Sequence, residues 1–212
     1  MIFKPLIIFV VLSAGGAGTL LTCRSKTETP AMTTDESQPI DKGMESIPVQ
    51  PEEYRVYSAF VRTRIFDGDR LVLISDATVP VVIDDPGNKI LLNGLITQLS
   101  GRTVQDFRAK NAASATMHDS FDLPVAHTLV AGKVIQSMMP GGPEAWRDFT
   151  RKYQGARNVF RFSRVGFNNS KDEALLFVNG FGGPGGGFGG FAWMVKEQGS
   201  WKVRTFRGPD IN

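Results

Sequence analysis

The chain has a single cysteine, Cys23, which lies outside the part of the sequence with a globular composition. No disulfide can therefore cross-link residues 51–212, so packing must stabilise this segment. Its length is typical of one domain, and a chain of this size can bury about 70% of its extended surface. We expect residues 51–212 to fold as a single compact domain.

Cys23 also ends an N-terminal segment with the three parts of a secretory signal. Lys4 supplies the positive start, residues 6–12 form a short apolar centre, and residues 13–18 are small. The apolar centre is shorter than the about 20 residues that a membrane-spanning helix needs. The pattern predicts a signal peptide at residues 1–22. An uncleaved N-terminal anchor is the alternative, because the small residues lengthen the apolar run.

Cys23 is the candidate site of lipid attachment. Leu20 has the lipobox position three residues before the cysteine, whereas Thr22 is larger than the residue usually found directly before it. The alternative is cleavage after Gly18, which would leave a free thiol. A lone thiol is a liability in an oxidising compartment, which favours lipidation. Arg24 rather than Asp follows the cysteine, which slightly favours the outer membrane; a periplasmic or secreted protein is the alternative.

Residues 23–50 are rich in Thr, Ser, Pro and acidic side chains and contain few apolar residues. Such a segment cannot bury enough surface to offset the entropy of ordering. A flexible coil of this length spans roughly 30 Å. We interpret it as a tether that holds the domain away from a membrane.

The formal net charge of the whole chain is only +3, and the basic residues form no run. The single cysteine also leaves no zinc-finger spacing. Nucleic acid is therefore not an expected partner.

Helical periodicity comes early in the domain and strand-like alternation comes late. Apolar residues recur at steps of three and four over residues 54–65, more weakly over 90–99, and again over 143–153. Residues 100–124 are polar and predict no element. The segments with strand character are 71–75, 79–83, 128–135, 160–167, 174–178, 191–196 and 201–206. The order predicts an α+β fold with N-terminal helices and a C-terminal antiparallel β-meander.

Residues 180–190 contain eight glycines, two phenylalanines and one proline. A phosphate-binding loop would need a helix directly after it, with Lys and Ser or Thr at its start. A strand pattern follows here instead, so we interpret the segment as a long mobile hairpin loop. Phe181 and Phe188 are candidate contacts for a partner or a membrane surface, because exposed aromatic side chains are enriched in interfaces.

One polar segment contains the side-chain types that bind zinc. Its candidate ligands are His118, Asp119, Asp122 and His127. Their spacing matches no zinc motif, so we expect a polar loop without a metal. The chain has no Gly-x-Ser-x-Gly elbow either. We therefore assign no catalytic residue and expect no cofactor.

Three groups of segments occur together in one order. They are 53–60 (EYRVYSAF) with 71–78 (LVLISDAT), then 146–153 (WRDFTRKY), then 163–168 (SRVGFN) followed by 174–178 (ALLFV) and 201–203 (WKV). This combination resembles a broad group of uncharacterised bacterial exported proteins and lipoproteins. The group has no established activity, so the resemblance implies only the fold and a location in the bacterial envelope.

Many members of that group have a Cys-Gly-Gly-x-Cys-Gly loop between the second and third meander strands. This chain has residues 181–186 (FGGPGG) there. The cysteine chemistry of those relatives is therefore excluded.

We expect a non-enzymatic binding or assembly module of the bacterial cell envelope, attached to a membrane through Cys23 and binding an envelope protein. The alternative is a small envelope hydrolase with a site near residues 118–127 or in the glycine-rich segment. A pocket that brings His118, His127 and a carboxylate within hydrogen-bond reach would favour the hydrolase.

Overall fold

The computed structural model describes residues 47–65, 69–138, 142–183 and 186–211. The predicted signal peptide, Cys23 and most of the predicted tether lie outside these residues. The last part of that tether, residues 47–50, is described, and Val49 in it is buried in a hydrophobic cluster. No helix within the described ranges is long and apolar enough to cross a membrane.

The described residues combine helices with one mixed sheet, as the α+β prediction requires. The helices are α1 (Pro51–Arg62), α2 (Pro86–Leu92), α3 (Gly101–Lys110), α4 (Gly132–Met138) and α5 (Gly142–Lys152). The strands are β1 (Leu71–Ser75), β2 (Ala126–Val130), β3 (Ala156–Phe162), β4 (Gly166–Phe167), β5 (Glu173–Gly183), β6 (Gly186–Glu197), β7 (Ser200–Arg207) and β8 (Asp210–Ile211). Since α4 and α5 lie between β2 and β3 in the chain, the helices are not confined to its beginning.

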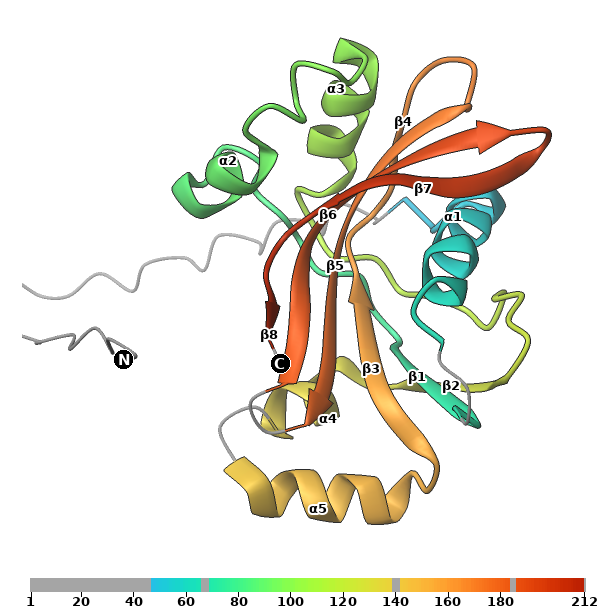
Figure 1. The fold of residues 1–212 in the computed structure, drawn as a ribbon, viewed down its shortest axis with the longest axis vertical. Helices are drawn as coiled ribbons and strands as arrows, with labels where there is room; N and C mark the ends of the chain where they lie inside the picture. Colours follow the sequence, from blue (N-terminus) through green and yellow to red (C-terminus); the bar gives the residue numbers. More distant parts are fainter. Residues whose placement is uncertain (1–46, 66–68, 139–141, 184–185, 212) are drawn as a thin grey trace, which may run out of the picture. The chain divides into compact units, whose positions relative to one another are not determined.

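The sheet has the strand order β2-β1-β3-β5-β6-β7, with β4 beside β5 and β8 beside β6 (Figure 1). Strand β1 is parallel to both of its neighbours, β2 and β3. The pairs from β3 through β7 are antiparallel. Parallel neighbours need a long connection, which the intervening helices provide.

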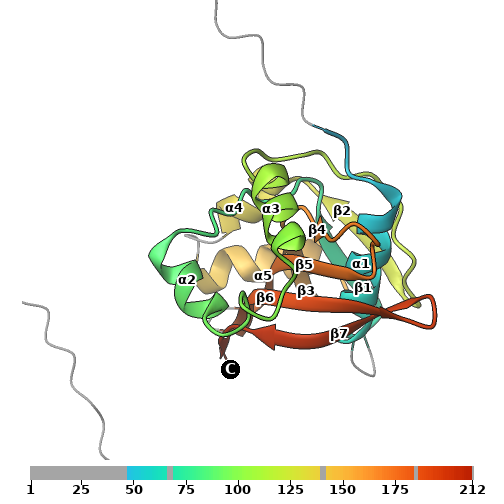
Figure 2. The same ribbon diagram turned by 90° about the horizontal axis from the view of Figure 1, so that it is seen from above.

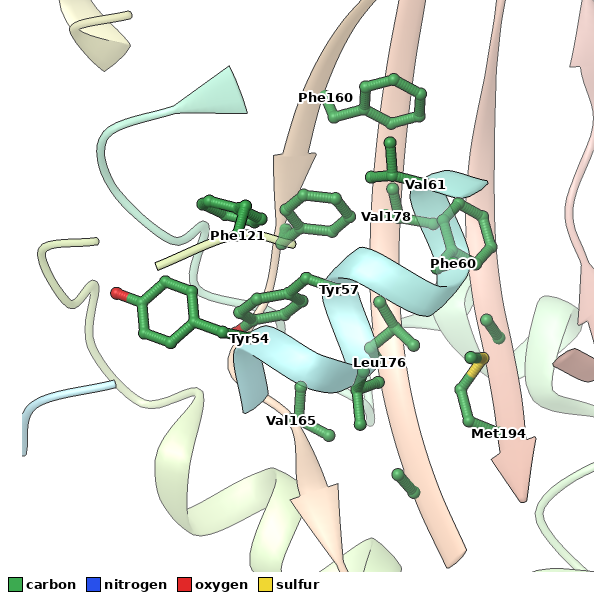
Figure 3. Packing of buried hydrophobic residues seen from close by; sticks show 14 of the residues in the cluster. Tyr54, Tyr57, Phe60, Val61, Phe121, Phe160, Val165, Leu176, Val178 and Met194 are labelled. Carbon is green, nitrogen blue, oxygen red and sulfur yellow. The ribbon is translucent and has the colours of Figure 1, made fainter. Parts of the chain in front are cut away.

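Helix α1 covers one face of this sheet. Pro51 suits its first turn, and a carboxylate oxygen of Glu53 accepts a hydrogen bond from the Gln50 backbone N–H at 3.1 Å. Tyr54, Tyr57, Phe60 and Val61 point from the helix into the main core, where they meet side chains of the strands (Figure 3). The predicted periodicity of this segment thus corresponds to its buried face.

Two separate helix layers cover the opposite face of the sheet (Figure 2). Side chains of α2 and α3 pack on β5 and β6, with Leu92, Phe107 and Phe191 at the centre. Side chains of α4 and α5 pack on β1, β2 and β3 around Ile135 and Phe149. Arg161 of β3 and Asn179 of β5 also lie on this face of the sheet, and neither belongs to the two hydrophobic clusters.

Several expected elements differ from the observed ones. Residues 79–83 are irregular, and the helix expected at 90–99 is α2 at 86–92 followed by turns. Gly94 has a φ of +74°, a backbone conformation that a helix cannot continue through. The segment without a predicted element contains α3, and the strand expected at 128–135 is divided between β2 and α4.

The interpretation of residues 180–190 as a mobile loop is wrong. These residues are mostly strand, because β5 and β6 continue as an antiparallel pair to Gly183 and Gly186. The physical reason is close approach. A side chain at Gly180 would overlap the ring of Phe188, and one at Gly190 would overlap the backbone of Arg207. Glycine is therefore used here to let neighbours approach rather than to make the chain flexible.

Candidate functional site

The four candidate metal ligands do not form one cluster. His127 Nε2 lies 2.6 Å from Asp119 Oδ1, so these two side chains meet. Asp122 instead pairs with Arg62, and the His118 backbone N–H donates to the Tyr54 hydroxyl at 2.7 Å. Within the described ranges, no three His, Cys, Asp or Glu side chains are grouped so that they could hold a metal ion.

The two candidate contact phenylalanines lie on opposite faces of the β5–β6 hairpin. Phe181 pairs with Gly187 in the register and Phe188 with Gly180, so their positions alternate across the sheet. Phe188 packs against the main core, with Phe60, Phe160 and Phe206 around its ring. Phe181 is partly buried on the other face. The two rings therefore do not form one joint surface.

A cavity of about 360 Å³ opens on the sheet face opposite α1. Arg161 of β3 together with Phe177 and Asn179 of β5 forms its floor, and the segment 79–82 with the start of α2 forms its wall. We call it the Arg161 cavity. Its lining residues are Val79, Pro80, Val81, Val82, Asp85, Asn88, Arg161, Phe177 and Asn179. Its size is within the range of small-ligand pockets.

Arg161 is the central polar residue of this cavity. Its side chain is partly buried, and its Nε atom is fully buried without a hydrogen-bond partner among the described residues. Burial lowers the pKa of the guanidinium from its usual value, because desolvation disfavours the charged form. The group still carries its charge at neutral pH, since guanidinium pKa values are far above 7. The cavity thus contains a positive charge that no described carboxylate neutralises by an ion pair.

Asn179 lies directly beside Arg161, because the two residues are register partners on β3 and β5. A Cβ atom at the neighbouring Gly189 would lie 2.5 Å from Asn179 Oδ1. The absence of a side chain at Gly189 therefore leaves the space that the Asn179 amide occupies. A guanidinium and a side-chain amide are both hydrogen-bond donors, so together they suit an acceptor group on a ligand.

The rest of the lining consists of five apolar and three polar residues. Val79, Val81 and Phe177 belong to the second hydrophobic cluster or pack against it. Val82 has 67% of its surface exposed, and Ile90 on the adjoining helix α2 has 76% exposed. Asp85 is the acidic lining residue, and its Oδ1 accepts a hydrogen bond from the Gly87 backbone N–H at 2.9 Å. The cavity therefore combines one cation with walls that are partly apolar and partly polar.

A second cavity, of about 230 Å³, contains three cations, Arg102, Lys110 and Lys171. Arg102 and Lys171 are exposed to water, unlike the partly buried Arg161, and Arg102 and Lys110 have side-chain partners. Lys110 Nζ lies 2.7 Å from a carboxylate oxygen of Asp106, and Arg102 donates to the Gln105 side chain at 3.2 Å. The contrast makes the Arg161 cavity the better candidate for ligand binding.

Glu53 and Arg164 are a pair of strongly buried charges with a structural role. Glu53 and Arg164 are almost fully buried, and two hydrogen bonds of 2.7 and 2.9 Å join the carboxylate to the guanidinium. Burial by itself lowers the pKa of Arg164, but hydrogen bonding and the charge of Glu53 raise it above its usual value. Burial also raises the pKa of Tyr57, whose hydroxyl donates to the Ser163 backbone carbonyl at 2.8 Å. These groups satisfy one another and are not available to a ligand.

Sequence reasoning missed Arg161, Asn179 and Arg164. Arg161 stands between two buried phenylalanines, and this alternation is typical of a strand with one solvent-facing side. Nothing in the pattern indicated that the segment 79–82 passes over that side. The sequence therefore shows only the alternation, which does not tell whether the polar face of the strand is open to water.

Comparison with known proteins found no matching family model, no matching curated protein and no matching solved structure. The function must therefore be argued from the geometry of this chain.

Proposed function

We propose that this chain is a binding module of the bacterial cell envelope, attached to a membrane by a lipid on Cys23 and a tether after it. Its α+β domain carries the ligand site on the sheet, at the side of a C-terminal antiparallel meander formed by β5, β6 and β7. The outer membrane is the favoured location, and an envelope protein remains a candidate partner.

The Arg161 cavity is the observation that carries the binding role. A partly buried guanidinium without an ion-pair partner among the described residues is unfavourable for folding, because its desolvation is not offset. Groups whose pKa is shifted by burial are enriched at functional sites. The apolar walls of the cavity supply the surface that a ligand can bury.

The start of the described chain supports the tethering role. Arg164 donates to the backbone carbonyl of Ile47 at 2.6 Å and to that of Pro48 at 3.2 Å. The same guanidinium is paired with Glu53 of α1. The chain that follows the tether is therefore joined to the core directly where it enters the fold.

Attachment is tested by expressing the full chain and Cys23→Ser in bacteria and comparing their membrane fractions. The wild type should remain with the membranes and carry a lipid adduct at Cys23 by mass spectrometry. The variant should lose the adduct. An unmodified thiol at Cys23 in the mature wild-type protein would show that the lipid attachment is wrong.

The contact between His127 and Asp119 favours one alternative, a small envelope hydrolase. A carboxylate that binds a histidine can orient it as a general base. The test is hydrolysis of a panel of short-chain nitrophenyl esters by wild type and His127→Ala. Activity in the wild type that His127→Ala abolishes would support the hydrolase. Equal rates of ester hydrolysis for the two proteins would exclude the hydrolase.

A further inference from the structure

We propose that the Arg161 cavity binds the carboxylate group of a ligand whose apolar body lies against Val79, Val81 and Phe177. This inference rests on the proposed binding function and names the chemical class of the ligand.

The donors favour a planar acceptor. The guanidinium of Arg161 presents its N–H groups in a flat fork that matches the two oxygens of a carboxylate. Asn179, its register partner on β5, adds an amide N–H donor from the adjacent strand. Within the described ranges Arg161 forms no ion pair, and its Nε atom is enclosed without a hydrogen-bond partner. The terminal N–H groups of the guanidinium are therefore the ones that can meet a ligand beside Asn179.

The single guanidinium of the lining suits a ligand group with no more than one negative charge. Arg161 is the one cation and Asp85 the one carboxylate among the lining residues. A dianionic phosphate would gain a single cation and would also meet the charge of Asp85. A carboxylate needs only one guanidinium, so the balance of charge in the cavity suits it better.

The walls favour an apolar body of modest size. Valine side chains and the ring of Phe177 surround the polar donors, and the volume is about 360 Å³. The exposed side chain of Val82 extends the apolar surface outward at the rim. Burial of an apolar group there, next to a paired carboxylate, would supply both affinity and orientation.

The test uses isothermal titration of the full-length protein with two matched probes. N-acetyl-L-phenylalanine has a carboxylate and an apolar ring, and N-acetyl-L-phenylalanine amide has the same ring without the charge. We expect the acid to bind about tenfold or more tightly than the amide, because a charge-assisted bidentate contact is lost in the amide. Equal affinities, or no binding of the acid in the millimolar range, would overturn the inference.

Substitution of Arg161 distinguishes a ligand contact from a structural role. Arg161→Met should weaken acid binding about tenfold or more, and Arg161→Lys should restore part of it, because a point charge replaces the fork. The matched control is Arg207→Met, an exposed arginine on β7 that does not line the cavity. The control should bind the acid as the wild type does.

The melting temperature of the unliganded variants gives the second readout. Arg161→Met should be at least as stable as the wild type, since it removes a desolvated charge without a partner. A lower melting temperature together with unchanged acid binding would assign Arg161 a structural role and refute the proposal.

Two sources can supply the same carboxylate: a small free acid or the C-terminus of a peptide. A hexapeptide ending in free L-phenylalanine separates them, because a tighter titration than that of N-acetyl-L-phenylalanine would assign the peptide. Weaker peptide binding would assign the free acid. Failure of all carboxylate probes in a protein that is lipidated at Cys23 would refute this inference and leave the membrane attachment standing.

Discussion

Glu53 joins two distant parts of the chain through one buried carboxylate. It pairs with the Arg164 guanidinium and also accepts the Val165 backbone N–H at 2.9 Å. Its side chain has no exposed surface, so water cannot replace a lost partner. The pair thus links helix α1 to the segment between β3 and β4, more than a hundred residues later in the sequence.

We predict that Glu53→Gln destabilises the domain by about 3–5 kcal/mol, because it leaves the buried Arg164 charge without its counter-ion. The measurement is the free energy of unfolding from urea titration. The control is Glu144→Gln, which removes an exposed i,i+3 pair with Arg147. It should change stability by less than about 1 kcal/mol. Similar losses in both variants would contradict the special role of the buried pair.

The Glu52 side chain makes the stability of the fold depend on pH. Burial raises its pKa, but hydrogen bonds from Lys196, Trp201 and Arg55 outweigh this, so that the net pKa is below the usual 4.5. Because the pKa of Glu52 is lower in the folded than in the unfolded state, the ionised carboxylate stabilises the fold at pH values above the unfolded-state pKa. This contribution is lost as the pH falls through the folded-state pKa.

We therefore expect Glu52→Gln to be less stable than the wild type at neutral pH, with a difference that shrinks as the pH falls below 4.5. Urea unfolding of both proteins between neutral and acidic pH measures it. A difference that stays constant over this range would show that the carboxylate charge is not responsible.

Among the elements, the β5–β6 hairpin depends most on residues that look unstructured in the sequence. Gly190 lies where a side chain would overlap the backbone of Arg207 and Gly208. The ring of Phe188 occupies the space that a side chain at Gly180 would need. These contacts are between strands or across a face, so their cause is packing and not turn geometry.

We predict that Gly190→Ala destabilises the domain by about 1–3 kcal/mol, because a methyl group forces the strands apart. Gly101→Ala is the matched control, since nothing lies within 4 Å of its Cβ position and the residue is helical. The control should be neutral or more stable by up to about 1 kcal/mol. Thermal unfolding of both variants decides between close packing and a tolerant loop; equal melting temperatures would favour the loop.

The sequence predicts correctly those helices and strands whose local residue pattern agrees with their surroundings in the folded structure. Helix α1 has its turn residues, its acidic first turn and its apolar stripe within one stretch, and the structure places it at Pro51–Arg62. The strand at 201–206 is likewise β7, which begins at Ser200 after Gln198 and Gly199 with positive φ angles. The extension of β5 and β6 could not be predicted, because glycine has low strand propensity unless a partner requires close approach.

For the whole molecule, the start of the described chain belongs to the folded unit. Val49 is buried, and the carbonyls of Ile47 and Pro48 accept hydrogen bonds from Arg164. The predicted boundary at residue 51 divides these contacts. Composition failed here because the segment 47–50 (IPVQ) is only four residues long, and its two aliphatic side chains are too few to stand out next to the polar segment before it.

We predict that a chain beginning at Ile47 unfolds at the same temperature as the full chain, whereas one beginning at Pro51 is destabilised by about 1–3 kcal/mol. The second chain loses the carbonyl acceptors of Arg164 and the buried Val49 side chain. Differential scanning calorimetry of the two truncations measures this. Equal melting temperatures of the two truncated chains would show that residues 47–50 do not stabilise the domain. The tether would then extend to residue 50, as the composition indicated.

The sequence already determines the mixture of α and β, the helical periodicity of α1 and the lack of disulfides within residues 51–212, and it contains the pattern before Cys23 from which we propose export. Each of these depends on residues that are close in the chain or on simple composition. The parallel pairing of β1, the strand structure of the glycine-rich segment and the Arg161 cavity depend on contacts between distant residues. They arise only when the chain folds, because the segment 79–82 covers the polar face of β3 through long-range packing that no local pattern encodes.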